Sequence, residues 1–365
     1  MKVGIITVHG TVNAGASLQT HALYHKLTMM GHSPMIINYR PERFSDMMDD
    51  RRKWHWKGVK TWLKALILYR RLQKKHDKQI LFEKKYYPDQ TRRYNSAEEL
   101  KSDPPQMDCY ICGSDQIWNP RHIEYDDSFF LGFVKSGASK IAYAASIGED
   151  NLTEKDVGFL KNSTEGFSSI GVREDSAVEI MRQCGRDATQ NIDPTLLMTA
   201  DYWRGIAEKP KRKLPEKFIF YYPLQHNPDE IHFIARLKEE TGLPCVSVES
   251  ALRPVKGTDI QIPDSSPNEF LWLMDNAQYV ITNSFHGLVF AILFKKRIIS
   301  FKNEYRNCRL DSLCRLFGLE GLQVDSMADF SMENRRVFWQ KMAYSDNILL
   351  REREKAELYL RQVLK

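Results

Sequence analysis

The chain of 365 residues contains no uninterrupted apolar run of about eighteen residues, so the sequence does not predict a transmembrane helix. Its first residues, Met1–Val8, form a strand pattern that runs into polar residues, unlike a signal peptide. We therefore expect a cytoplasmic protein. Only six cysteines occur, at positions 109, 112, 184, 245, 308 and 314, and most lie within apolar patterns. Reduced cysteines behave there as small hydrophobic residues, so we expect no disulfides.

Metal and nucleotide motifs are also missing. Cys109 and Cys112 have the spacing of a zinc or redox pair, but no second Cys or His pair follows at zinc spacing, which favours core packing. His21 and His25 share a helical face without the glutamate and third ligand of a zinc enzyme. The loop His9–Gly15 matches neither the dinucleotide nor the P-loop glycine spacing. We expect no metal and no cofactor.

The charge and the length of the chain limit which classes of protein fit the sequence. Lys and Arg number 53 against 47 acidic residues, a formal charge of +6, which suits an anionic substrate or a negatively charged surface. This charge is lower than that of a dedicated nucleic-acid-binding protein, so we expect no nucleic-acid partner. With 42% hydrophobic residues, a chain of this length can fill the cores of two domains.

Strand and helix patterns alternate along the chain in two runs, which predicts an α/β fold with two parallel, Rossmann-like sheets facing a cleft. The strands expected in the first run are Val3–Val8, Pro34–Tyr39, Met107–Cys112, Lys140–Ser146, Ser168–Val172 and Asn191–Pro194. Those expected in the second are Phe218–Tyr222, Cys245–Val248, Tyr279–Thr282 and Arg297–Phe301. The charged, proline-bearing stretch Glu208–Pro215 is the predicted linker. The resulting domains are residues 1–200 and 215–330, and helices in 331–365 are expected to cross back to the first domain.

A basic helical insertion is predicted at about residues 49–94. Within it, residues 50–72 interleave Trp and Leu with Lys and Arg at helical spacing, as an amphipathic helix at an anionic membrane surface does. A helix packed on the first domain with its charged face in solvent has a similar pattern, and such charge runs more often form a solvent-exposed face. Peripheral contact with the inner face of the plasma membrane therefore stands as one of two hypotheses.

The segment Tyr279–Gly287 carries the strongest chemical signal. Tyr279–Thr282 reads as a buried strand and Leu288–Phe294 as an apolar helix, which leaves a polar turn at the carboxyl end of the strand. Ligands of open α/β sheets bind at such ends, and the N–H groups of the following helix favour an anion. The turn consists of Asn283, Ser284, His286 and Gly287, and its histidine can titrate near neutrality. A phosphorylated substrate is the first hypothesis.

Seven short motifs, in this order along the chain, resemble those of the polysaccharide pyruvyltransferases. They are Asn13–Gln19, Gly113–Asn119, Ala142–Gly148, Val172–Ser176, Asp193–Leu197, Thr282–Gly287 and Cys308–Leu313. The resemblance implies transfer of a pyruvyl group from phosphoenolpyruvate to two sugar hydroxyls, forming a pyruvate ketal on a cell-surface polysaccharide or on its lipid-linked precursor. It also implies an architecture like that of the two-domain GT-B glycosyltransferases, and it places phosphoenolpyruvate on Arg173 and His286.

The residue types fit this chemistry. A planar guanidinium recognises carboxylate or phosphate in a bidentate manner, which suits Arg173, and Ser284, Asn283 and Gly287 would complete the phosphoenolpyruvate site around His286. His286 and Asp115 are the catalytic candidates, as the acid and as the group that positions or deprotonates the acceptor. Asn13, Gln19 and Asp193 are the candidates for the acceptor side.

Each candidate also has a structural reading. Arg173 could form an ion pair at a helix start, Asp115 could cap a turn, and Asp193, before a proline, could simply end a strand. Two other functions stay open. One is a nucleotide-sugar-dependent glycosyltransferase of GT-B type, and the other is a non-catalytic glycan-binding protein.

Overall fold

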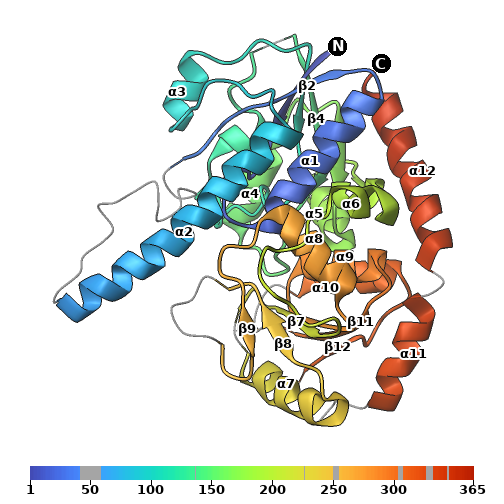
Figure 1. Cartoon of the computed structure of the whole chain (residues 1–365). Coiled ribbons are helices and arrows are strands. Elements are labelled where there is room, and N and C mark those ends of the chain that lie inside the picture. The colour runs from blue at the N-terminus through green and yellow to red at the C-terminus, as the bar shows by residue number, and fades with distance from the viewer. Residues whose placement is uncertain are drawn as a thin grey trace.

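The computed structural model describes residues 1–41, 59–135, 137–225, 227–249, 255–302, 307–325, 332–342 and 345–365. Within them the strands form two six-stranded sheets, in the orders β2-β1-β3-β4-β5-β6 and β12-β11-β10-β7-β8-β9, and every pairing is parallel (Figure 1). The predicted α/β fold class is confirmed. The sheets use residues 2–190 and 219–324, with the predicted linker between them.

The first sheet is short-stranded and covered by helices. Its strands are β1 Lys2–Ile6, β2 Ser33–Ile36, β3 Cys109–Cys112, β4 Ser139–Ala145, β5 Ser169–Val172 and β6 Thr189–Gln190. Its helices are α1 Ala14–Met29, α3 Ala97–Ser102, α4 Glu154–Ser163 and α5 Asp175–Gln183. The strand β3 is fully buried, as expected for a parallel strand covered on both faces, and the predicted cysteine pair lies within it. All six cysteines are free and buried.

The second sheet repeats this plan. Its strands are β7 Ile219–Tyr222, β8 Cys245–Ser247, β9 Ile260–Gln261, β10 Tyr279–Thr282, β11 Arg297–Phe301 and β12 Gln323–Val324. Its helices are α7 Pro228–Thr241, α8 Pro267–Asn276, α9 Phe285–Leu293, α10 Cys308–Leu316 and α11 Met332–Met342. Local signals set these helix starts. For example, Ser266 and Glu269 form a capping box around Pro267 at the start of α8.

Three helices join the two halves. The long α2, Val59–Tyr86, packs on both α1 and α8, and α6, Ala200–Ile206, leads into the linker. The last helix, α12 Ser345–Val363, returns to the first half along one side of the molecule (Figure 1). There Tyr359 Oη donates to the Ala142 carbonyl at 2.8 Å, and the Arg353 guanidinium donates to two carbonyls, of Leu196 and Met198.

One local prediction was wrong. The expected strand Asn191–Pro194 is a loop after β6, followed by a short 3₁₀ helix, Pro194–Leu197. The reason is that Asp193 Oδ1 accepts from the Thr195 N–H at 3.0 Å, which starts the 3₁₀ helix instead of continuing the sheet. The first helix begins at Ala14 because the Asn13 side chain caps it.

The membrane hypothesis rested on residues 50–72. Of these, residues 50–58 and the side chains of residues 59–67 lie outside the part of the chain that is described. In the described ranges, no helix combines the length and the apolar character needed to cross a membrane.

Candidate functional site

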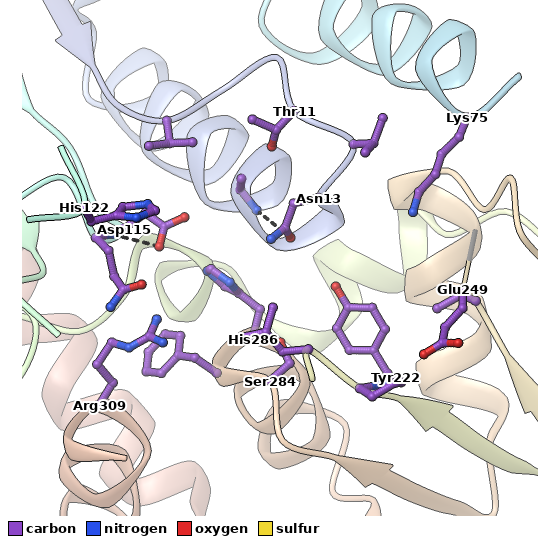
Figure 2. A pocket seen from close by; sticks show the side chains of 18 of the residues that line it. Thr11, Asn13, Lys75, Asp115, His122, Tyr222, Glu249, Ser284, His286 and Arg309 are labelled. Carbon is purple, nitrogen blue, oxygen red and sulfur yellow. Dashed lines mark hydrogen bonds between the residues drawn. The ribbon is translucent and has the colours of Figure 1, made fainter. Parts of the chain in front are cut away.

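A cavity of about 590 Å³ lies where the carboxyl ends of the two sheets meet (Figure 2). The strand order reverses between β1 and β3 in one sheet and between β7 and β10 in the other. Such reversals open a crevice in which α/β proteins bind ligands. The cavity is lined from all four strand ends, by Val8, Asp115, Tyr222 and Ser284. The topology therefore directs both crevices into one shared space.

His286 lines the cavity and lies close to the first helix. Ser284 is the N-cap of α9 and accepts from the Gly287 N–H at 3.4 Å, so the helix begins at Phe285 and presents His286 in its first turn. The His286 ring also packs against the start of α1. A Cβ on Gly15 would lie only 2.3 Å from His286 Nδ1, so this approach requires glycine.

A buried carboxylate lies behind the histidine. Asp193 Oδ2 is 3.6 Å from His286 Nε2 and accepts from Arg173 Nη1 at 2.9 Å. It also accepts from Ser114 Oγ at 2.9 Å. Burial would raise the pKa of Asp193, but His286 and Arg173 together hold it well below its ordinary value. Asp193 is thus an anion that holds Arg173 in place and lies within ion-pair distance of His286, whose Nε2 has no hydrogen-bond partner among the described residues.

Arg173, the predicted phosphoenolpyruvate arginine, does not line the cavity. It is 5% exposed, its guanidinium lies 4.0 Å from the Phe285 ring centre, and its Nε and Nη2 atoms are buried without a hydrogen-bond partner. The structure therefore places Arg173 one layer behind the cavity, between Asp193 and Phe285.

The arginine that does line the cavity is Arg309, in the first turn of α10. It is 6% exposed, and its Nε atom is buried without a hydrogen-bond partner. Burial, followed by the nearby Arg173 charge, lowers the pKa of Arg309 to about 10, so it is still a cation at neutral pH. The motif Cys308–Leu313 carried the family resemblance, but nothing in that motif showed that its arginine would reach this cavity.

Asp115 faces His286 and Arg309 across the cavity (Figure 2). Its backbone has φ +81°, unusual for a residue other than glycine, and is held by bonds from the Ser146 and Ile117 N–H groups to its carbonyl. Burial would raise the pKa of Asp115, but Arg173, His286 and Arg309 outweigh it and lower the pKa. A carboxylate with a lowered pKa is a weak base, so Asp115 is better suited to positioning a ligand than to removing a proton.

The other predicted site residues divide between cavity and scaffold. Asn13 lines the cavity, but its Oδ1 caps α1 by accepting from the Gly15 N–H at 2.9 Å. Gln19 is fully buried and donates to Thr7 Oγ1 at 2.9 Å, so it holds the loop after β1 and is not part of the lining. Asp193, proposed for the acceptor side, also lies behind the lining.

Asn283 and Gly287 have internal partners as well. Asn283 Oδ1 accepts from the Leu224 N–H at 2.6 Å and its Nδ2 donates to the Gln225 carbonyl at 2.7 Å, which fixes the loop after β7. A Cβ on Gly287 would lie 2.4 Å from Thr282 Oγ1, so glycine is needed there for packing. Within the turn 283–287, the residues that reach the cavity are Ser284, Phe285 and His286.

A second end of the cavity was not predicted. Tyr222 directs its hydroxyl into the space, and Glu249 and Lys75 lie beyond it (Figure 2). Burial raises the pKa of Tyr222 to about 12, so the hydroxyl keeps its proton at neutral pH. Lys75 and its neighbour Leu72 belong to α2, which therefore covers this end. No sequence motif marked these positions, because they come together only when α2 packs across the two halves.

Metal binding has no support in the described ranges, where no three His, Cys, Asp or Glu side chains gather in a way that could hold an ion. Among the described residues, the cations that line the cavity are Arg309 at one end, Lys75 at the other and, when protonated, His286. This arrangement can hold a small anion at one end and a neutral polar group at the other.

The fold and the site define a two-sheet α/β protein with a cavity between the sheets, one end of which is lined by Arg309 and His286. The model of the family described as polysaccharide pyruvyl transferase matches residues 13–305, and the chain belongs to this family. The predicted resemblance is thereby confirmed. No curated protein matches the sequence.

Solved structures with similar folds are much more distant. A UDP-N-acetylglucosamine 2-epimerase is 10% identical, with a TM-score of 0.54, and the match covers 100% of this chain and 96% of that one. The Neisseria meningitidis UDP-GlcNAc 2-epimerase bound to UDP-GlcNAc is 11% identical, with a TM-score of 0.51 and 94% of each chain covered. The Streptomyces glycosyltransferase SsfS6 is 13% identical over 96% of this chain and 99% of that one, with a TM-score of 0.40. At such identities the likeness to the two epimerases concerns the fold alone.

Proposed function

We propose that this chain transfers a pyruvyl group from phosphoenolpyruvate to two hydroxyls of a sugar, forming a pyruvate ketal, without a cofactor. The observation that carries the proposal is the juxtaposition of Arg309, His286 and Asp115 at one end of the cavity, in a chain of the polysaccharide pyruvyl transferase family. Phosphoenolpyruvate carries a carboxylate and a phosphate, and a buried guanidinium with an unpartnered N–H suits either group.

In this proposal Arg309, and not the predicted Arg173, binds phosphoenolpyruvate directly. Arg173 supports it from behind, because its charge reaches the cavity while its own guanidinium is held by Asp193. Ser284 and the N-terminus of α9 add a favourable dipole for an anion at the same end. The donor end is therefore assigned to Arg309, His286 and Ser284.

The reaction needs an acid. One proton adds to C3 of phosphoenolpyruvate, which makes the methyl group and leaves cationic character at C2. The first hydroxyl oxygen then bonds to C2 and loses its proton, the C2–O bond to phosphate breaks, and the second hydroxyl closes the ring and loses its proton. Of the two protons released, one balances the proton added to C3 and the other leaves with phosphate. His286, within ion-pair distance of Asp193, is the proposed acid, and the Asp115 carboxylate stabilises positive charge at C2.

The other end of the cavity is the proposed acceptor site. Tyr222 offers an aromatic face and a protonated hydroxyl, and Glu249 offers carboxylate oxygens that can accept from sugar hydroxyls. Of the predicted acceptor residues, Asn13 lies along the wall between the two ends. Gln19 and Asp193 are withdrawn from this role because they lie behind the lining.

A nucleotide-sugar-dependent glycosyltransferase is the second candidate. One observation favours it, namely that the solved structures of similar fold include an epimerase bound to UDP-GlcNAc. A glycosyltransferase would need to hold a nucleotide in the same cavity, whereas pyruvyl transfer needs a small anion at one end and a sugar at the other. The choice of donor therefore separates the two functions.

Thermal unfolding with phosphoenolpyruvate, UDP-GlcNAc or inorganic phosphate is the deciding experiment. A ligand at a hundred times its Kd stabilises the folded state by about 2.7 kcal/mol. We expect phosphoenolpyruvate alone to raise the melting temperature. The shift should disappear in Arg309→Lys, shrink in Arg173→Lys and persist in Arg315→Lys, a matched control in which an exposed arginine of the same helix is changed.

A shift with UDP-GlcNAc only would move the assignment to glycosyl transfer. If Arg309→Lys and Arg315→Lys shift equally with phosphoenolpyruvate, the donor end is misassigned. Once a donor is found, phosphate release with a panel of sugars carrying paired hydroxyls tests turnover. Binding of a glycan without turnover would instead support a non-catalytic protein.

A further inference from the structure

A second concavity, which we call the α2–linker groove, shares no lining residue with the cavity described above. It measures about 560 Å³ and is bounded by α2, by the linker and by residues 259–264 around β9. Its basic residues are Arg71 and Lys74 from α2 and Arg212 and Lys213 from the linker. Four cations from two segments far apart in the sequence thus converge on one surface groove.

The groove has two carboxylates against its four cations. Asp259 lies 2.7 Å from the Lys238 ammonium and also accepts from the Cys245 N–H at 2.7 Å. Asp264 lies 3.6 Å from the Lys78 ammonium. Each acidic side chain is therefore within ion-pair distance of a lysine that lies outside the groove, and the groove keeps an excess of positive charge.

The basic side chains are also accessible. Lys74, Arg212 and Lys213 are exposed, and among the residues that the structure describes, the ammonium groups of Lys74 and Lys213 make no hydrogen bond or ion pair. Arg212 is held on the sheet edge, where its guanidinium donates to the Gln261 carbonyl. A guanidinium held in place beside exposed ammonium groups can contact more than one phosphate.

We propose that the α2–linker groove binds the phosphate groups of an anionic lipid surface. A groove of about 560 Å³ has room for a phosphate-bearing headgroup, and like charges held together are stabilised when anions lie between them. The groove is next to the substrate cavity, because Gln261 in its wall donates to the carbonyl of Glu249, a cavity residue, at 2.9 Å. Lipid binding would therefore hold the Tyr222 end of the cavity at the membrane surface. This proposal does not depend on which donor the cavity takes.

The test is co-sedimentation of the full-length protein with vesicles. Phosphatidylcholine vesicles with and without about 30% phosphatidylglycerol are compared, so that binding to an anionic surface is separated from binding to a neutral one. Each basic residue near an anionic surface strengthens binding about fivefold. The double variant Lys74→Gln/Lys213→Gln removes the two exposed lysine charges of the groove and should weaken binding to the anionic vesicles roughly 30-fold. The matched control Lys2→Gln/Lys161→Gln removes the same charge from exposed positions elsewhere and should stay within about twofold of the native protein.

Three outcomes would overturn the proposal. Equal losses in the two double variants would show that only net charge matters, and unchanged binding of Lys74→Gln/Lys213→Gln would show that the groove is not involved. The third outcome comes from a parallel measurement of melting temperature with millimolar inorganic phosphate. If phosphate stabilises the native protein but not Lys74→Gln/Lys213→Gln, and the native protein does not bind vesicles, the groove is a site for free phosphate. The response to phosphoenolpyruvate should persist in both variants, so this test is separate from that of the proposed function.

Discussion

Glu230 is a fully buried acid near the substrate cavity, and it leads to a prediction whose size can be worked out. It lies in the first turn of α7, where the Tyr221 hydroxyl donates to its Oε2 at 2.7 Å while its Oε1 has no hydrogen-bond partner. Burial raises the pKa of Glu230 to about 7. The charged form is thus disfavoured in the folded protein, and we predict that Glu230→Gln, which mimics the neutral acid, stabilises it at alkaline pH.

The sign and magnitude follow from linkage. Between the ordinary pKa of 4.5 and the folded value of about 7, the folded state binds one more proton than the unfolded state. Its stability therefore falls as pH rises through this window and levels off above it. At about 1.36 kcal/mol per pH unit, the native protein loses about 3 kcal/mol that the variant keeps. For a domain of the size of this half of the chain, that is a difference of about 6–12 °C in melting temperature.

Thermal unfolding of both proteins from pH 4.5 to pH 8 measures this difference. The two melting temperatures should be close at the acidic end and should separate as pH rises, with the variant higher. Glu239→Gln, at an exposed position of the same helix, is the control and should follow the native curve. A pH-independent gap between Glu230→Gln and the native protein would refute the reasoning, because it would mean that Glu230 does not bind a proton in this range.

The remaining predictions concern the site. Gly15→Ala should displace the His286 ring, whose Nδ1 would lie 2.3 Å from the new Cβ, and abolish turnover in a folded protein, while Gly158→Ala, in open space, should have no effect on activity. His286→Gln should lower kcat at least about 100-fold with little change in the phosphoenolpyruvate KM, and equal small effects on both would contradict its role as the acid. Asp193→Asn should destabilise the fold by about 3–5 kcal/mol, because it leaves its arginine partner buried without a carboxylate, whereas Asp201→Asn, at an exposed ion pair, should not measurably change the melting temperature.

Much of this protein could be predicted from local sequence. Apolar runs at strand length, separated by helical patterns, require parallel sheets covered on both faces, and two such runs predicted two sheets. The position of His286 was also predictable, because a polar turn between a buried strand and an apolar helix must lie at a strand end. The short motifs were sufficient to identify the family. In each case the deciding interactions lie within a few residues of one another.

The roles of individual polar side chains were decided only by the tertiary structure. Arg173 and Arg309 are both motif arginines, and nothing local showed that Asp193 would hold the first behind the wall while α10 brought the second into the cavity. Asn283 was expected to meet the substrate but instead bonds the loop after β7. A polar side chain can satisfy its hydrogen bonds with a ligand or with any backbone group that packing brings near, and burial makes an unsatisfied group costly. The sequence by itself therefore determined which polar groups gather at the strand ends, and the tertiary structure decided which of them remain available to a substrate.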